Sequence, residues 1–424
     1  MPWVLTQICQ SWRNYVLSTP RLWSFISIRF ASAGGGPGPE GYIQLQAKNH
    51  RLRLQLRRSS THPLTIVTRF PDNSPFASPG DRALFLMCTH AARWRDIRIE
   101  LNNTCAGDLS ALRGLLPMLE SLYITFLEEV LNQEVTAFEV APRLTNLILS
   151  GKHCRGSTGT TVLRLPFPQI TNFSWYDETS PSIRSSVGWR AQHEILSRLQ
   201  NVEKCRVSLH TLSIDAHRID VQDNAGQPFH VVTLPKLREL ELIDNRGISG
   251  IDMMFSSIQA PSLTSLTISS SGRTRNPLVN LLSFTNSLLN LSIHDVEMSP
   301  LEFGAVLLGL ASLTDLSFGV GGGITNSYLG LFRETDDGIG GFSAVPKMQN
   351  LTLVEITGAV SSYSEDVLLD MLGARRRKGT TQAFKWRLLS VELGLGVVTE
   401  SARARLVELR AEGLRVRLPV EELS

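Results

Sequence analysis

The chain has 424 residues, of which 42% are hydrophobic and 19% are charged, and its formal net charge is +3. This composition is typical of a folded globular protein and excludes a chain that is disordered throughout. The small net charge gives no support to nucleic-acid binding, and no run of 18 apolar residues predicts a membrane span. The length allows two or three ordinary domains or one long solenoid.

The positive charge is concentrated near the N-terminus, where residues 1–100 contain 13 Lys and Arg but 5 Asp and Glu. Two interpretations of this basic quarter are open: it binds an acidic protein partner, or it is a solvated surface.

The cysteines and the N-terminus indicate the compartment. The five scattered cysteines contain no CxxC pair, so we expect reduced thiols in a cytoplasmic or nuclear protein. The first 13 residues include Trp, Gln and Arg and lack the apolar core of a signal peptide.

The first predicted element is an amphipathic helix at the N-terminus. Its apolar residues recur at helical spacing and form one stripe: Val4, Leu5, Ile8, Cys9, Trp12 and Val16. Trp12 is expected to pack inward. Pro20 ends the helix, and residues 22–28 can pack back as an extended segment. Residues 31–82 are interpreted as a linker, rich in Gly and Pro at 34–39, followed by an N-terminal cap. Residues 83–94 predict a helix that leads into a strand.

A repeated phrase extends from residue 94 to the C-terminal region. In each copy, apolar residues stand at the first, fourth and sixth positions. Pro often stands two positions before the first of them. Leu263, Leu266 and Ile268 are one copy, and there are eleven copies in all. Six of the ten steps between successive copies are 25 or 26 residues long. This spacing and this pattern are typical of leucine-rich repeats.

The repeat predicts a leucine-rich-repeat solenoid over residues 83–424, in the α/β class. Each phrase predicts a short strand, and the chain returns through roughly helical segments such as 301–310 and 365–372. The longer steps are expected to contain inserted loops, one of which is the basic run 375–379. The asparagine that usually follows the strand is replaced by Lys152, Ser271 and Val296 in three copies, although Asn245 fits. We therefore expect an irregular horseshoe. A β-sheet domain with coincidental phrases is the competing interpretation.

Residues 2–30 resemble the C-terminal half of an F-box, as found in the large F-box families of mushroom-type fungi. The matching residues are Cys9, Trp12, Arg13, Pro20, Leu22, Trp23 and Ser24. The segments 50–59, 62–66 and 92–97 also resemble this family, and the later repeats are similar in style. The sequence therefore resembles a fungal F-box/leucine-rich-repeat protein with a partial F-box at 1–30.

The resemblance implies a substrate-recognition subunit of a cullin–RING ubiquitin ligase. The F-box would dock a Skp-type adaptor through Val4, Leu5, Ile8 and Cys9, and the repeats would hold a target protein. A complete F-box begins with a further helix that the sequence from Met1 lacks, so we expect this chain to bind the adaptor weakly or not at all. Two alternatives remain: a free-standing leucine-rich-repeat module, whose N-terminal segment only caps the solenoid, and a ribonuclease-inhibitor-like blocker.

No sequence motif predicts catalysis, a metal site or a cofactor. His193 and Glu194 lack the second His of a zincin, and the glycines at 319–323 do not form a nucleotide-binding pattern. Binding is instead expected on the concave face, where residues between the buried strand positions point outward. Aromatic residues and arginine dominate binding hot spots, so such residues are favoured there. The candidates are Tyr123, Tyr176, Lys204, Arg206, Glu239 and Glu241.

Overall fold

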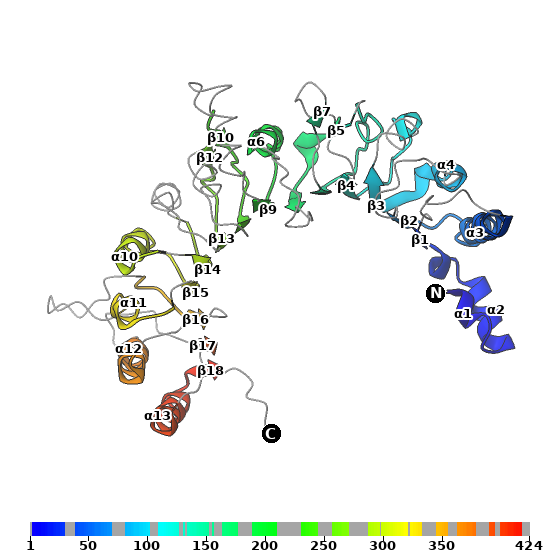
Figure 1. Cartoon of the computed structure of the whole chain (residues 1–424). Helices are drawn as coiled ribbons and strands as arrows, with labels where there is room; N and C mark the ends of the chain where they lie inside the picture. Colours follow the sequence, from blue (N-terminus) through cyan, green and yellow to red (C-terminus); the bar gives the residue numbers. More distant parts are fainter. Residues whose placement is uncertain are drawn as a thin grey trace. The chain divides into compact units, whose positions relative to one another are not determined.

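The computed structural model of the chain forms two compact units, Met1–Leu199 and Gln200–Ser424 (Figure 1). The residues it describes are 2–29, 39–69, 81–101, 109–126, 130–131, 134–151, 155–156, 163–176, 189–209, 230–244, 257–270, 287–296, 298–320, 323–332, 345–354, 363–378, 390–394 and 399–417.

The N-terminal unit is a parallel sheet with helices beside it. Its sheet strands, in spatial order, are β1 (Phe25–Arg29), β2 (Leu64–Arg69), β3 (Trp94–Leu101), β4 (Ser121–Phe126), β6 (Asn146–Gly151) and β8 (Asn172–Tyr176). The short strands β5 (Val130–Leu131) and β7 (Arg155–Gly156) pair separately. The helices are α1 (Pro2–Leu5), α2 (Gln10–Ser18), α3 (Pro39–Arg58), α4 (Asp81–Cys88) and α6 (Trp189–Arg198). Single 3-10 turns are η1 (Pro20–Trp23), η2 (Ala91–Arg93), η3 (Ser110–Leu112) and η4 (Phe167–Gln169).

The C-terminal unit has the same construction. Its sheet strands are β9 (Lys204–Leu209), β11 (Glu239–Asp244), β13 (Ser265–Ser270), β14 (Asn290–Val296), β15 (Asp315–Val320), β16 (Asn350–Val354), β17 (Ser390–Gly394) and β18 (Arg415–Arg417). The strands β10 (Val232–Thr233) and β12 (Ile258–Gln259) form a separate pair. The helices α10 (Pro300–Leu308), α11 (Asn326–Gly330), α12 (Glu365–Lys378) and α13 (Glu400–Ala411) lie on one side of this sheet (Figure 1).

Equivalent positions of the repeated phrase lie in register. The central leucines of β11 and β13 are partners, as are those of β13 and β14, of β14 and β15, and of β15 and β16. In the other unit, Leu122 of β4 faces Leu147 of β6 in the same way. All described sheet pairings are parallel, which is the pairing expected when successive strands are joined by helical or extended crossovers. The predicted strands and the mixed α/β class are confirmed.

The apolar positions of the phrase form the core between strands and helices. Leu147, Leu240, Leu266 and Leu351 are all buried, as predicted. The return helices predicted at 301–310 and 365–372 are present as α10 and α12. Helix α10 begins with a capping box, in which the Ser299 hydroxyl and the Glu302 carboxylate each accept a hydrogen bond from the other residue's backbone N–H. Both elements of the phrase, strand and return, therefore follow from the sequence pattern.

The basic run at 375–379 was predicted to be an inserted loop, and this prediction is wrong for the described residues. Residues 375–378 form the last turn of α12, and Arg375 is buried. Its guanidinium donates hydrogen bonds to the carbonyl oxygens of Phe332 (3.0 Å) and Val345 (3.1 Å). Burial lowers the pKa of Arg375 to about 9, so the side chain stays charged at pH 7. Helix α12 therefore extends to Lys378, beyond its predicted end at residue 372.

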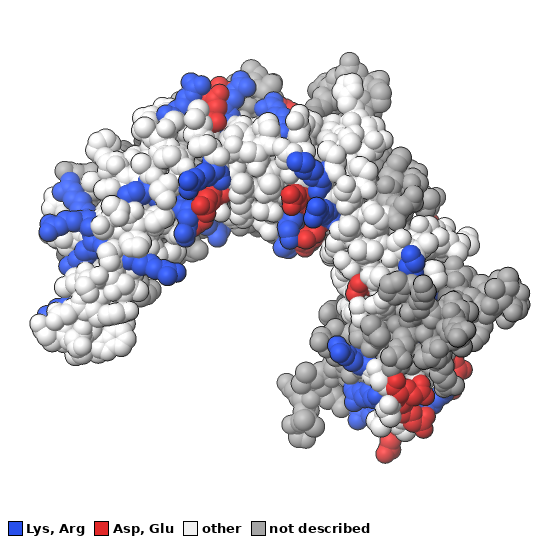
Figure 2. All heavy atoms as spheres, turned by 180° about the vertical axis from the view of Figure 1, so that it is seen from behind, with Lys and Arg blue, Asp and Glu red and all other residues white. Residues whose placement is uncertain are grey.

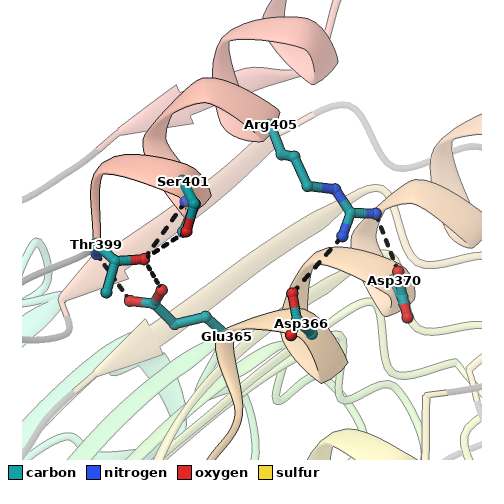
Figure 3. A network of polar contacts seen from close by, with 7 residues as sticks. Glu365, Asp366, Asp370, Thr399, Ser401 and Arg405 are labelled. Carbon is teal, nitrogen blue, oxygen red and sulfur yellow. Dashed lines mark hydrogen bonds and ion pairs between the residues drawn. The ribbon is translucent and has the colours of Figure 1, made fainter.

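Helices α12 and α13 are joined by a polar network on their exposed sides (Figure 3). Arg405 of α13 lies 3.0 Å from Asp370 and 3.9 Å from Asp366, both on α12. The Glu365 carboxylate accepts hydrogen bonds from the backbone N–H and the hydroxyl of Thr399, which is the N-cap of α13. This network fixes the start of α13 against the start of α12.

The N-terminal segment differs from its prediction in two ways. The single amphipathic helix is interrupted, because α1 ends at Leu5 and α2 begins at Gln10. Trp12 was expected to pack inward, but 46% of it is exposed. Trp23 occupies the interior instead, and its indole N–H donates to the Val16 carbonyl at 2.8 Å. Of the extended segment predicted at 22–28, the part from Phe25 is present as β1, whereas Leu22 and Trp23 end the 3-10 turn η1.

Residues 31–82, interpreted as linker and cap, include two complete elements and the start of α4. Helix α3 and strand β2 lie in this range, and β2 pairs with β1 on one side and β3 on the other. The glycine-rich part at 34–38 lies outside the described residues, as do Lys152, Asn245 and Ser271. Val296, the fourth of the asparagine-position residues, is buried at the end of β14.

Candidate protein-binding surface

The strands of each unit have one buried side and one accessible side. Along β4 the residues alternate between partly exposed and buried, and β8 and β13 alternate in the same way. The accessible residues of neighbouring strands stand side by side because the strands are paired in register. We call the accessible side of each unit its strand face. All six residues predicted for partner binding lie on a strand face.

On the N-terminal unit, the strand face is built around Tyr123. The Arg98 guanidinium of β3 lies over the Tyr123 ring of β4, 4.1 Å from its centroid, which is the geometry of a cation–π contact. Asp96, two residues before Arg98, accepts hydrogen bonds from the Thr65 hydroxyl (3.2 Å) and from Arg95 (2.9 Å). Positive, negative and aromatic groups are thus fixed next to one another.

These residues border a surface hollow of about 180 Å³. The hollow spans four neighbouring strands, and its lining comprises Thr65, Ile66, Val67, Asp96, Ile97, Arg98, Ser121, Leu122, Tyr123, Asn146 and Ile148. Tyr123 therefore belongs to the hollow, whereas Tyr176, at the end of β8, does not. The alternation of the repeat placed Arg98 and Ile148 on this face too, although they were not chosen as candidates, and the sequence reasoning missed Val67. The alternation of residues 64–68 was the signal that could have placed β2, and hence Val67, on this face.

On the C-terminal unit, four of the predicted residues form a ladder of two ion pairs. The register of β9 and β11 places Lys204 opposite Glu239 and Arg206 opposite Glu241. The Lys204 Nζ is 2.8 Å from the Glu239 carboxylate, and an Arg206 Nη is 3.2 Å from that of Glu241. The sequence found these residues by type and position, but their pairing follows from the register of strands 35 residues apart in the sequence.

The ladder is partly exposed, so each pair is expected to contribute little to stability. Exposed ion pairs contribute about 0.2–1 kcal/mol each. Replacing Glu239 and Glu241 together by Gln should lower the free energy of unfolding by about 0.5–2 kcal/mol at low salt. The loss should shrink at high salt, because screening weakens exposed pairs in the parent. Urea unfolding at two salt concentrations measures it, and a salt-independent loss would contradict the exposed ladder.

Further along this strand face, small polar groups follow. The Ser292 hydroxyl and His294 Nε2 are 2.6 Å apart, and burial lowers the pKa of His294, so its ring is neutral at pH 7. Asn350 of β16 donates to the Asp315 carboxylate of β15. Among the described residues, no group of three or more His, Cys, Asp or Glu is placed to hold a metal ion.

Cys205 of β9 lies beneath the ladder, on the buried side of the sheet. Burial raises the pKa of its thiol to about 12, so almost no thiolate forms at pH 8. We expect iodoacetamide to modify Cys9, which is exposed, and to leave Cys205 unmodified until the protein is unfolded. Peptide mass spectrometry after labelling with and without urea checks this. Fast native labelling of Cys205 would show that β9 opens readily.

The four residues predicted to bind an adaptor lie at the N-terminal end of the N-terminal unit. Val4 and Ile8 are largely exposed and Cys9 is exposed, whereas Leu5 is half-buried. Tyr15 of α2, which the helical stripe did not include, is also largely exposed. The segment thus presents apolar side chains from α1, from the turn after it and from α2.

No protein-family model matches the chain, and no curated protein matches it. Among the described helices, none is both long enough and apolar enough to cross a membrane.

Proposed function

We propose that the chain is a protein-binding scaffold, and that it serves as the substrate-recognition subunit of a cullin–RING ubiquitin ligase. In this proposal the parallel strands are turns of a leucine-rich-repeat solenoid whose strand face holds a target protein. The N-terminal segment is a partial F-box, which would dock a Skp-type adaptor together with an upstream F-box helix. The chain itself catalyses nothing and works in the cytoplasm or nucleus.

The observation that carries the proposal is the in-register repetition of one strand phrase. Spacings of 25 or 26 residues, buried central leucines and parallel pairing are the properties that a leucine-rich repeat needs. A stack of this kind exposes a row of side chains from successive strands, which suits the recognition of another protein. The Arg98–Tyr123 contact and the neighbouring hollow supply the aromatic and arginine groups typical of binding hot spots.

The exposed apolar side chains at the N-terminus support the adaptor part of the proposal. Large apolar residues that stay exposed on a short helical segment favour a protein partner. Because residues 2–30 resemble an F-box, we propose that this partner is a Skp-type adaptor.

The second candidate is a free-standing leucine-rich-repeat module, and a specific observation favours it. Strand β1 pairs in parallel with β2, and Val16 and Trp23 are fully buried behind it. The N-terminal segment therefore supplies the first strand of the sheet, which is the position of a solenoid cap. A cap and a docking segment can coexist, so adaptor binding has to be measured directly.

The decisive experiment is a pull-down of recombinant Skp-type adaptor. We expect the 424-residue chain to bind the adaptor weakly or not at all, and a version carrying an added upstream F-box helix to bind it. Weak binding is expected because the interface would be too small. A stable interface buries about 1,200–2,000 Å² of surface, and the two short helices α1 and α2 do not reach this area. Val4→Asp with Ile8→Asp in the extended version should abolish the binding.

The control is Val407→Asp in the extended version, which introduces a charge at an exposed apolar position of α13. Tight binding by the chain without the added helix would support the ligase role but contradict the area argument. No binding by the extended version would favour the free-standing module.

A further inference from the structure

Two rows of side chains line the hollow on the strand face of the N-terminal unit, and the rows differ in chemistry. The first row consists of Val67, Arg98, Tyr123 and Ile148, which stand side by side on β2, β3, β4 and β6. The second row lies two residues earlier on each strand and consists of Thr65, Asp96, Ser121 and Asn146. All of these residues are partly exposed. The hollow therefore has one side that is mainly apolar and one side that is polar.

Contacts within the protein fix the polar side of the hollow. The Asp96 carboxylate accepts hydrogen bonds from the Thr65 hydroxyl at 3.2 Å and from Arg95 at 2.9 Å. The Asn146 amide donates to the Ser121 hydroxyl at 3.5 Å. Figure 2 shows Lys or Arg next to Asp or Glu at several places on the N-terminal unit, and the Arg95–Asp96 pair is an arrangement of this kind. Because these side chains already have partners, binding in the hollow orders few of them anew.

The charges that line the hollow favour an uncharged occupant. An anionic side chain in the hollow would approach the Asp96 carboxylate, and a cationic side chain would approach the Arg98 guanidinium. Like charges brought together at an interface are unfavourable. A neutral side chain avoids both contacts.

The size and the walls of the hollow suit one aromatic ring. Its volume is about 180 Å³, and an apolar cavity of about 150 Å³ in another protein holds benzene. The Tyr123 ring offers an aromatic wall, and aromatic rings favour edge-to-face and offset contacts with one another. The Arg98 guanidinium favours the face of a ring for the same reason that it lies over Tyr123. Val67 and Ile148 add aliphatic contacts.

We propose that this hollow receives one aromatic side chain of the target protein, which anchors an extended segment of the target on the strand face. The proposal rests on the proposed function, because it names what the strand face of the N-terminal unit recognises. The Ser121 hydroxyl and the Asn146 amide border the hollow, where they supply hydrogen bonds to the backbone of the bound segment.

Selection of a random peptide library displayed on phage against the full chain tests this. We expect the enriched peptides to share one aromatic residue. In fluorescence anisotropy with such a labelled peptide, replacing the aromatic residue by Ala should weaken binding at least about tenfold, and replacing it by Leu should weaken binding less. Raising the salt concentration from about 50 to about 300 mM should change the affinity by less than about threefold, because the anchor is neutral.

Ser121→Trp fills the hollow with a ring of the protein's own and should weaken binding at least about tenfold. Its matched control is Ser265→Trp, because Ser265 is likewise the partly exposed first residue of a strand, β13 of the other unit. This control should leave the affinity unchanged. Ile148→Ala removes one aliphatic wall without adding bulk and should weaken binding at least about threefold. Circular dichroism checks that each variant is folded.

Several results would overturn the proposal: no enriched peptide, enriched peptides without an aromatic residue, equal binding of the Leu peptide, or full binding by both Ser121→Trp and Ile148→Ala. Peptides that lose binding in Ser265→Trp instead would also overturn it, but they would leave a protein-binding strand face in place. The adaptor pull-down is independent of the hollow, so the failure of this proposal and the failure of the ligase role are distinguishable.

Discussion

Replacing Leu266 by alanine is expected to lower the free energy of unfolding of the C-terminal unit by about 2–5 kcal/mol. Leu266 is fully buried in β13, and its partners in register are Leu240 of β11 and Leu291 of β14. The truncation leaves a cavity between three stacked repeats, where the in-register neighbours limit the relaxation that could fill it. Urea unfolding followed by circular dichroism measures the loss.

Thr267→Ala is the matched control for this prediction. Thr267 follows Leu266 on the same strand but belongs to the strand face, where it is partly exposed. Its replacement removes a similar number of atoms without opening a core cavity, so the change should stay below about 1 kcal/mol. Equal losses for the two variants, or no loss for Leu266→Ala, would contradict the assignment of buried and accessible sides.

The repeat made the strands predictable because it carries several independent signals. The spacing, the alternation and the recurring proline all indicate the same strand, as in the copy around Leu266. The return helices α10 and α12 were also predictable from their apolar periodicity. Local pattern and tertiary packing agree in these regions, so reading the sequence was sufficient.

Single elements outside the repeat were harder to predict. Trp12 was expected to pack inward because a large aromatic residue just before Arg13 suits the core of an F-box, but Trp23 is the buried tryptophan of this segment. Which one is buried depends on the partners Val16, Trp3 and Arg58, and Arg58 comes from a distant helix. Arg375 was assigned to a loop because the basic run falls in one of the longer steps between repeat copies. Two backbone carbonyl groups accept hydrogen bonds from its guanidinium, which makes its burial in α12 possible.

The sequence predicted which strand residues are accessible, but not which of them lie next to one another. Alternation placed Tyr123, Lys204 and Glu239 on accessible sides correctly. The hollow beside Tyr123 is lined partly by residues of β2. The sequence pattern does not predict that β2 pairs with β3. The pairing of Lys204 with Glu239 depends likewise on strand register, which no single repeat specifies.

Trp23→Ala is expected to destabilise the N-terminal unit by about 3–5 kcal/mol. Trp23 is fully buried, and its ring meets the Trp3 ring edge to face at a centroid distance of 4.9 Å. The substitution would leave a large cavity, remove the donor to the Val16 carbonyl and deprive the Arg58 guanidinium of its main aromatic partner. Circular dichroism during urea unfolding is the suitable measurement, because tryptophan fluorescence changes with the substitution itself.

Trp12→Ala is the matched control, since it makes the same chemical change in the same segment. Trp12 is 46% exposed, so its loss should cost less than about 1.5 kcal/mol. The two variants also separate stability from docking. If the segment binds an adaptor, Trp12→Ala should weaken binding in the extended chain while leaving the fold intact, whereas Trp23→Ala should weaken both. A larger loss of stability for Trp12→Ala than for Trp23→Ala would restore the sequence-based prediction that Trp12 packs in the interior.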